Sequence, residues 1–308
     1  MTAQTKMAET IGRAPGFDIP DPRTLPSLKG KVSAEEWRLR CELAAAYRLV
    51  AMYGWDDMIF THISLRLPEE NGEERFLLNP YGLFFEEITA SSLVKVDLKG
   101  NAVQETPYFT NPAGFTIHSA LHMAREDAHC VMHVHTPHGV AVSAQQDGLR
   151  RYSQFAMVVH DDVAYHDYEG IATDLDERER LVRDIGNHGF LILRNHGTLT
   201  VGANCATAFL RMYFLEQACR AQILARERDM LGETVLPRPG ALGTRNRLVG
   251  GDGSHARRRE ARAVRVAITC AFDVPTCTAV SAAICWARSR PKPRSASVLP
   301  RPARPPAP

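Results

Sequence analysis

Several common features are missing from this sequence of 308 residues, and each absence excludes a class of protein. No apolar run approaches the ~20 residues that cross a bilayer, so we expect no membrane-spanning helix. The first 18 residues lack the apolar core of a secretory signal, and the seven cysteines form no C-x-x-C pair. Both observations predict a cytoplasmic location. The sequence also contains neither G-x-G-x-x-G nor a P-loop, which excludes the usual nucleotide sites.

The net charge of +2 conceals a division along the chain. Residues 238–308 contain 14 basic and 3 acidic residues, a net charge of +11. The preceding residues contain 23 basic and 32 acidic residues, a net charge of −9. The same tail holds nine of the 19 prolines. We therefore expect a polar arm at residues 1–32, one folded domain at 33–236 and a disordered basic, Pro/Arg-rich tail at 237–308. The tail could contact nucleic acid or an anionic surface, but it lacks interleaved aromatic residues, so we expect no nucleic-acid partner.

Strands and helices are mixed along the domain without a regular βαβ alternation. This pattern favours an α+β fold or a three-layer α/β/α fold over a doubly wound sheet. The periodicity predicts helices at 33–52, 116–124, 139–144, 174–185 and 203–231. It predicts strands at 59–67, 75–78, 93–97, 130–134, 157–159, 163–165, 190–193 and 199–201.

Two histidines, His133 and His135, end one short apolar strand. Side chains on a strand alternate between faces, so both imidazoles point the same way, about 7 Å apart. They could bind one metal ion together if another segment of the chain supplied a third ligand. The alternative is that both rings are hydrogen-bonded at the rim of a core.

His196 has the same setting, because the apolar run 190–193 leads into Arg194-Asn195-His196-Gly197. Three histidines with coordination positions left open are typical of a catalytic metal site. We expect His133, His135 and His196 to bind a divalent metal. Zinc is the first choice, and Mn²⁺, Co²⁺ or Fe²⁺ remain alternatives.

The segments AGFTIHSALHMAREDAHCVMHVHTP, VAYHDYEG and LILRNHG together resemble the class II aldolase/adducin family, and the adducin-like branch in particular. That family includes fuculose-phosphate aldolase and ribulose-phosphate 4-epimerase, and the resemblance covers roughly residues 33–231. It implies a three-layer α/β/α fold around a mainly antiparallel sheet. It also implies a zinc site formed by the three histidines and a homo-oligomer, often a tetramer with active sites between subunits.

The sequence departs from the family at the positions that handle protons and phosphate. The aldolases carry an acidic acid/base residue where this chain has Gly114, and their phosphate-binding serines correspond here to Pro112 and Ala113. Of their Gly-Asn-x-Ser phosphate loop only Ser64 is kept, at the end of Thr61-His62-Ile63-Ser64. The resemblance therefore assigns substrate contact to Ser64, Gly82 and Gly114, but a phosphate would lack its hydroxyl donors.

A different proton carrier is then required. Metal-bound water is one candidate, and four residues clustered within a short stretch are others: His160, Asp161, Tyr165 and His166. The alternative for these four is an ordinary solvated turn followed by a strand.

Four further histidines have weaker arguments. His118 and His122 lie four residues apart on an expected helix and could chelate, but we expect His118 to be packed and His122 to be exposed. His62 and His138 lie near candidate sites without a spacing argument.

Two functions follow from these residues. The first is a metal-dependent lyase or isomerase that polarises the carbonyl or enediolate of a small hydroxy-carbonyl molecule. The second is a binding or scaffold domain like the adducin head, in which catalysis has lapsed.

Overall fold

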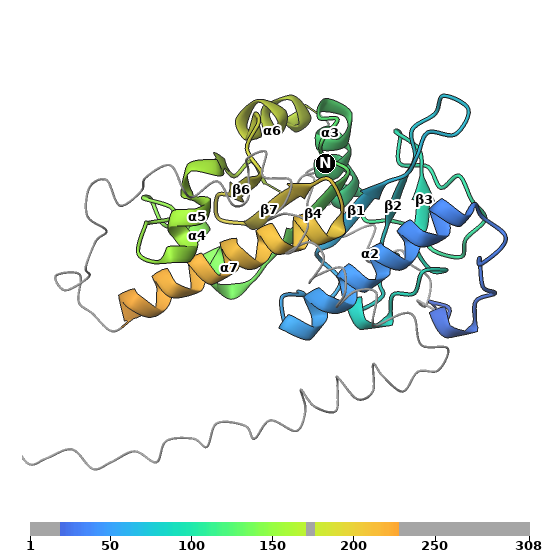
Figure 1. Ribbon diagram of the computed structural model, residues 1–308, viewed down its shortest axis with the longest axis horizontal. Coiled ribbons are helices and arrows are strands. Elements are labelled where there is room, and N and C mark those ends of the chain that lie inside the picture. Colours follow the sequence, from blue (N-terminus) through green and yellow to red (C-terminus); the bar gives the residue numbers. More distant parts are fainter. Residues whose placement is uncertain (1–18, 171–175, 228–308) are drawn as a thin grey trace, which may run out of the picture. The chain divides into compact units, whose positions relative to one another are not determined.

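The computed structural model of the chain describes residues 19–170 and 176–227 (Figure 1). All of them belong to one compact unit. The expected tail at 237–308 and most of the expected N-terminal arm lie outside these residues. The described end of the arm is docked, since the Tyr108 hydroxyl donates to Pro20 O at 2.7 Å and Leu28 N donates to Ser91 Oγ at 3.1 Å. Within the described residues, no helix is both long enough and apolar enough to cross a membrane.

A seven-stranded sheet forms the middle layer, in the order β3-β2-β1-β4-β7-β6-β5. Neighbouring strands are antiparallel except for β5 and β6. The strands are β1 (His62–Arg66), β2 (Phe76–Leu78), β3 (Val94–Val96), β4 (Cys130–Val134), β5 (Val163–His166), β6 (Phe190–Leu193) and β7 (Gly197–Gly202).

Helices cover both faces of this sheet, as Figure 1 shows. The helices α3 (Pro112–Ala124) and α6 (Glu177–Ile185) pack together on one face. The other face is covered by α2 (Ala34–Tyr53), α4 (Pro137–Ser143), α5 (Gln154–Val159) and α7 (Cys205–Glu227). Three short 3₁₀ turns complete the order: η1 (Pro22–Thr24), η2 (Phe85–Glu87) and η3 (His160–Asp162). The expectation of a three-layer α/β/α fold around a mainly antiparallel sheet is confirmed.

Local sequence signals account for the ends of the helices. Ser33 caps α2, because its hydroxyl accepts a hydrogen bond from Glu36 N at 3.0 Å, and Gly54 ends that helix in the left-handed region at φ 66°. The segment 157–159 was expected to be a strand, and that prediction was wrong. Ser153 caps a helical turn there by accepting from Ala156 N at 3.2 Å, and Ala156 and Val159 then bury one helical face.

The central strand β4 divides its side chains between the two cores. Cys130, Met132 and Val134 pack toward the α2 and α7 side, whereas Val131 packs with the α3 and α6 side. His133 follows the parity of Val131, so the alternation of the strand turns its ring toward the α3 side of the sheet.

Candidate metal centre

Three imidazoles meet at the end of β4. The ligand nitrogens of His133, His135 and His196 all lie within 4.8 Å of one another, and the Nε2 atoms of His133 and His135 are 2.9 Å apart. His196 comes from the tight turn between β6 and β7, where Asn195 adopts a left-handed φ of 56°. Asparagine is one of the few residues that tolerates this conformation. The structure therefore brings the three expected ligands together from two segments.

Second partners fix the orientation of the first two rings. His133 Nδ1 lies 3.0 Å from the carbonyl oxygen of Thr198, and His135 Nδ1 lies 3.0 Å from Asp57 Oδ2. A carbonyl and a carboxylate can only accept, so each Nδ1 carries the proton. In a neutral imidazole, the lone pair is then on Nε2. A partner that holds the other ring nitrogen in this way is typical of metal-binding histidines.

These residues fit a divalent cation. Two Nε2 lone pairs that face each other at 2.9 Å repel unless a positive charge lies between them. Two nitrogens bound to one tetrahedral zinc are separated by roughly 3.3 Å, which is close to this spacing. Burial, together with the neighbouring imidazoles, lowers the pKa of His133 well below 6.5 and that of His196 to about 4. Both rings are therefore neutral at pH 7, which is the form that binds metal.

Gly197 allows β7 to pass beside these rings. A Cβ at this position would lie 2.7 Å from the carbonyl oxygen of Val134 and 2.9 Å from Cδ2 of His135. The first of these atoms belongs to the backbone of the central strand and cannot move aside cheaply. Only glycine therefore fits at the start of β7.

A second group of buried histidines begins next to the metal centre. His62 lies opposite His133 in the β1–β4 pair, with ring centroids 5.1 Å apart. From His62 a hydrogen-bonded chain runs inward: Nδ1 of His62 to Nε2 of His118 (2.8 Å), Nδ1 of His118 to Ser64 Oγ (2.6 Å), Ser64 Oγ to Nε2 of His122 (2.6 Å), and Nδ1 of His122 to Ala128 O (2.6 Å). Ser64 therefore lies inside the protein between two imidazoles.

The packing of His118 was predicted, whereas the exposure of His122 was wrong, because both rings are 1% exposed. Residues 118 and 122 share one helical face, and that whole face of α3 lies against the sheet. Burial lowers the pKa of His118 well below 6.5 and the pKa values of His62 and His122 to about 3.

Gly114 lies directly against His62. A Cβ at position 114 would lie 2.6 Å from Cδ2 of His62 and 3.0 Å from its Nε2. The resemblance implies that this is the position of the aldolases' acid, and in this chain the space of its side chain is filled by the His62 ring from β1. The side chains of Pro112 and Ala113 lie outside the described part of the structure, and Gly82 lies in the turn after β2 with φ 100°.

The four expected proton carriers have partners of their own. Asp161 is paired with Arg151 and with His160, whose Nδ1 is 3.3 Å away, and the Tyr165 hydroxyl accepts from Leu149 N at 2.9 Å. These contacts are separate from the three imidazoles.

His166 is buried on β5, and its Nδ1 lies 2.7 Å from Asp184 Oδ2 and its Nε2 3.5 Å from Glu177 Oε1. Burial lowers its pKa, but the pairing with Glu177 and Asp184 outweighs that effect, so the pKa is raised overall. Of the four residues, His166 is the one whose charge affects His196.

A carboxylate–imidazole pair follows the metal centre along the chain. Glu216 of α7 is buried and accepts from the Thr136 hydroxyl, and its other oxygen lies 2.8 Å from Nδ1 of His138. These contacts hold the N-cap and the first turn of α4 against α7.

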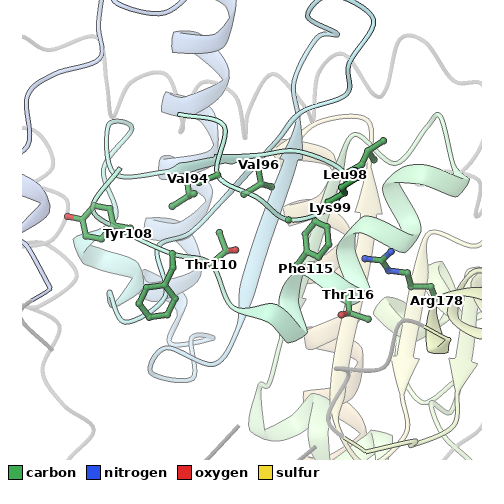
Figure 2. A pocket seen from close by; sticks show the side chains of 12 residues that line it. Val94, Val96, Leu98, Lys99, Tyr108, Thr110, Phe115, Thr116 and Arg178 are labelled. Carbon is green, nitrogen blue, oxygen red and sulfur yellow. The ribbon is translucent and has the colours of Figure 1, made fainter. Parts of the chain in front are cut away.

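A cavity of about 620 Å³ lies elsewhere, at the first turn of α3. Figure 2 shows Phe115 and Thr116 of that helix facing Arg178 of α6, whose guanidinium carbon lies 5.3 Å from the centroid of the Phe115 ring. Val94 and Val96 of β3 line the same space, and none of the three clustered histidines does. The candidate metal centre therefore rests on the geometry of its three histidines and not on this cavity.

Some of these partners could have been found from the sequence and others could not. His62 and Ser64 are two residues apart on a strand, so the alternation that paired His133 with His135 also puts them on one face. Asp57 and Thr198 carried no such signal, because their contacts depend on how separate segments meet.

Comparisons with known proteins point to one family. Residues 41–223 match the family model described as "Class II Aldolase and Adducin N-terminal domain". A "Putative aldolase class 2 protein" of Caulobacter vibrioides is 63% identical over 199 residues, which cover 65% of this chain and 77% of that protein. Alpha-adducin of Mus musculus is 47% identical over 188 residues, 60% of this chain but 25% of the adducin. The L-fuculose 1-phosphate aldolase from Glaciozyma antarctica superposes with a TM-score of 0.66 at 28% identity, covering 80% of this chain and 92% of that chain.

Proposed function

The chain belongs to the class II aldolase and adducin family, and from that premise we propose that it is a metal-dependent lyase or isomerase. Its substrate would be a small hydroxy-carbonyl molecule. The observation that carries this proposal is the convergence of His133, His135 and His196, with the lone pairs of the first two directed at each other.

In this proposal, the three imidazoles hold one divalent ion, with zinc as the first choice. Mn²⁺, Co²⁺ and Fe²⁺ are the alternatives, since all of them accept imidazole ligands. The ion, when bound, supplies a Lewis acid that polarises a carbonyl and stabilises an enediolate. The protein's contribution is orientation, because Thr198 O and Asp57 hold the first two rings by their Nδ1 atoms.

The substrate we propose is unphosphorylated. The solved relative from Glaciozyma antarctica is named for a sugar phosphate. In this chain, Pro112 and Ala113 stand where the resemblance places the phosphate-binding serines, and Ser64 alone remains of the phosphate loop. Ser64 is fully buried, and its oxygen already contacts His118 and His122. It could reach a phosphate only by giving up one of these bonds. Gly82 and Gly114 have no side chains, so they could contact a ligand only through backbone atoms.

The proton carrier is a separate part of the proposal. Of the four candidates, His166 has the strongest support, since it is buried among carboxylates and its charge affects His196. Asp161 and His160 face Arg151 and solvent, and Tyr165 holds a backbone amide. Single substitutions at the four positions, read by the turnover number under saturating substrate, would rank them.

The second candidate function is a binding domain in which catalysis has lapsed. Gly114 favours it, because no proton can be transferred by that residue, and so does the 47% identity to alpha-adducin. One experiment separates the two functions. The purified protein is analysed for metal and then assayed against a panel of hydroxy-ketones and hydroxy-acids. Turnover that is lost in His133→Ala supports the enzyme, and bound metal without turnover supports the binding domain.

We also propose that the chain forms a homo-oligomer, a tetramer by family resemblance, and that it is cytoplasmic. Support for the oligomer comes from large apolar side chains exposed around Asp57: Met52, Tyr53, Met58 and Phe60 are 55%, 45%, 58% and 38% exposed. Exposed apolar clusters of this kind are typical of protein interfaces. Light scattering during size-exclusion chromatography tests the oligomer, and cell fractionation tests the location.

A further inference from the structure

The hydrogen bonds of the buried histidine chain all donate in one direction, and the contact at its inner end determines which direction this is. The carbonyl oxygen of Ala128 can only accept, so Nδ1 of His122 carries a proton and donates to it. A neutral imidazole has one N–H, which leaves Nε2 of His122 as an acceptor. The hydroxyl of Ser64, 2.6 Å away, is the group that donates to this nitrogen.

The proton positions of Ser64, His118 and His62 follow in turn from that of His122. The single proton of Ser64 is used by His122, so its oxygen accepts from Nδ1–H of His118. His118 then has a bare Nε2, which accepts from Nδ1–H of His62. His62 is left with its lone pair on Nε2.

All three rings are neutral, because their surroundings offer nothing that would stabilise a charge. His62, His118 and His122 are 3%, 1% and 1% exposed. Within the described chain, their hydrogen-bond partners are one another, a hydroxyl and a carbonyl, and no carboxylate is among them. Charged imidazoles in such a place would be strongly destabilised.

The His62 ring lies beside the candidate metal centre without belonging to it. The ring is 5.1 Å from that of His133, centroid to centroid, but His62 is outside the set of ligands whose atoms converge within 4.8 Å. Its Nε2 has no hydrogen-bond partner among residues 19–170 and 176–227. The edge of the ring that carries Nε2 lies over Gly114.

We propose that His62 Nε2 is the hydrogen-bond acceptor for a hydroxyl group of the metal-bound substrate, in the place where the aldolases carry an acidic side chain. This inference rests on the proposed function, because it takes the metal to hold the substrate's carbonyl end. Gly114 is then a requirement of the site, since its missing side chain leaves room for the ring. Ser64, His118 and His122 are positioning residues that keep the lone pair of His62 outward.

An acceptor without a proton selects among ligands. It accepts from a hydroxyl, whereas it repels a second carboxylate or phosphate oxygen at the same place, because two acceptors cannot share a hydrogen bond. The site should therefore prefer a hydroxyl group next to the carbonyl or carboxylate that the metal holds.

The direction of the chain is tested in the metal-free wild-type protein. Long-range ¹H–¹⁵N correlation spectra of ¹⁵N-histidine-labelled protein report which ring nitrogen carries the proton, with each signal assigned by its loss in a single substitution. We expect His62, His118 and His122 all to be protonated on Nδ1 and bare on Nε2. A proton on Nε2 of His62 would overturn the proposal. This measurement needs neither metal nor turnover, so it can fail independently of the proposed function.

Binding of two small probes to the zinc-loaded full chain tests the role itself. Glycolate and acetate share a carboxylate and differ in one hydroxyl, and calorimetric titration gives the ratio of their affinities. In His62→Phe, which keeps a ring of similar shape, we expect this ratio to fall by about 2- to 10-fold, the range of one neutral hydrogen bond. His188→Phe, at a half-exposed ring paired with Asp162, is the control and should keep the ratio. An unchanged ratio in His62→Phe, or loss of zinc from it, would contradict the proposal.

Discussion

The His62 ring fills the space that a side chain at Gly114 would need, since a Cβ at position 114 would lie 2.6 Å from Cδ2 of the ring. A side chain at position 114 and the His62 ring in its present place therefore exclude each other. Restoring the acid alone would put two groups in the same place.

Gly114→Glu should for this reason not raise retro-aldol activity above that of the wild type. Overpacking a buried position of this kind typically costs about 1–3 kcal/mol of unfolding free energy. The double variant His62→Ala/Gly114→Glu removes the clash and should recover part of that stability. Thermal unfolding and a retro-aldol assay of both variants check the prediction. A stable and active Gly114→Glu would show that the ring moves freely.

Gly197→Ala should disrupt the metal centre, because its Cβ would lie 2.7 Å from Val134 O and 2.9 Å from Cδ2 of His135. We expect weaker metal binding and an unfolding free energy lower by about 1–3 kcal/mol. Gly72→Ala is the matched control. It introduces the same methyl group into open space at φ 78°, so it should cost about 1 kcal/mol and leave metal binding unchanged. Equal metal affinity in the two variants would contradict this account.

Asp57→Ala should weaken metal binding by about 10- to 100-fold, the usual effect of removing a partner that orients a ligand. The carboxylate lies 3.0 Å from Nδ1 of His135, whereas its neighbour Asp56 makes no such contact with that ring. Asp56→Ala is therefore the control and should bind metal as the wild type does. Competition with a chromophoric chelator gives the affinities, and equal losses in the two variants would exclude an orienting role for Asp57.

The stability of the protein should depend on pH through His166. Its pKa in the folded protein is raised above 6.5, because pairing with Glu177 and Asp184 outweighs burial. A raised pKa stabilises the fold fully below pH 6.5, and this contribution is lost as pH rises through the folded pKa. The stability difference between wild type and His166→Gln should therefore shrink from pH 6 to pH 9. Chemical denaturation across this range tests the trend, with His160→Gln, at a partly exposed ring, as the control.

How far the sequence predicts this structure depends on the range of each interaction. The alternation of one strand was enough to put His133 and His135 on one face, and the apolar run before His196 located the third ligand. The helix at 154–159 was missed because the apolar run Met157-Val158-Val159 fits either a strand or a short helix. Only the cap by Ser153 and the packing against α7 decide between them.

The contacts that orient the site were beyond reach for the same reason. Asp57 meets His135 across 78 positions of the chain, and Thr198 meets His133 across 65. No local sequence pattern predicts either contact. The exposure of His122 was wrong because its partners, Ser64 Oγ and Ala128 O, come from other segments and bury the ring against the sheet.

The most direct test of the central claim is a zinc titration of the metal-free protein, compared with His133→Ala and His138→Ala. His138 lies three residues after His135 and is held by Glu216, so its loss serves as the control for a nearby imidazole outside the ligand set. We expect one zinc ion per chain in the wild type and in His138→Ala, and none held tightly in His133→Ala. Stoichiometric zinc in His133→Ala, or its absence from the wild type, would contradict the account.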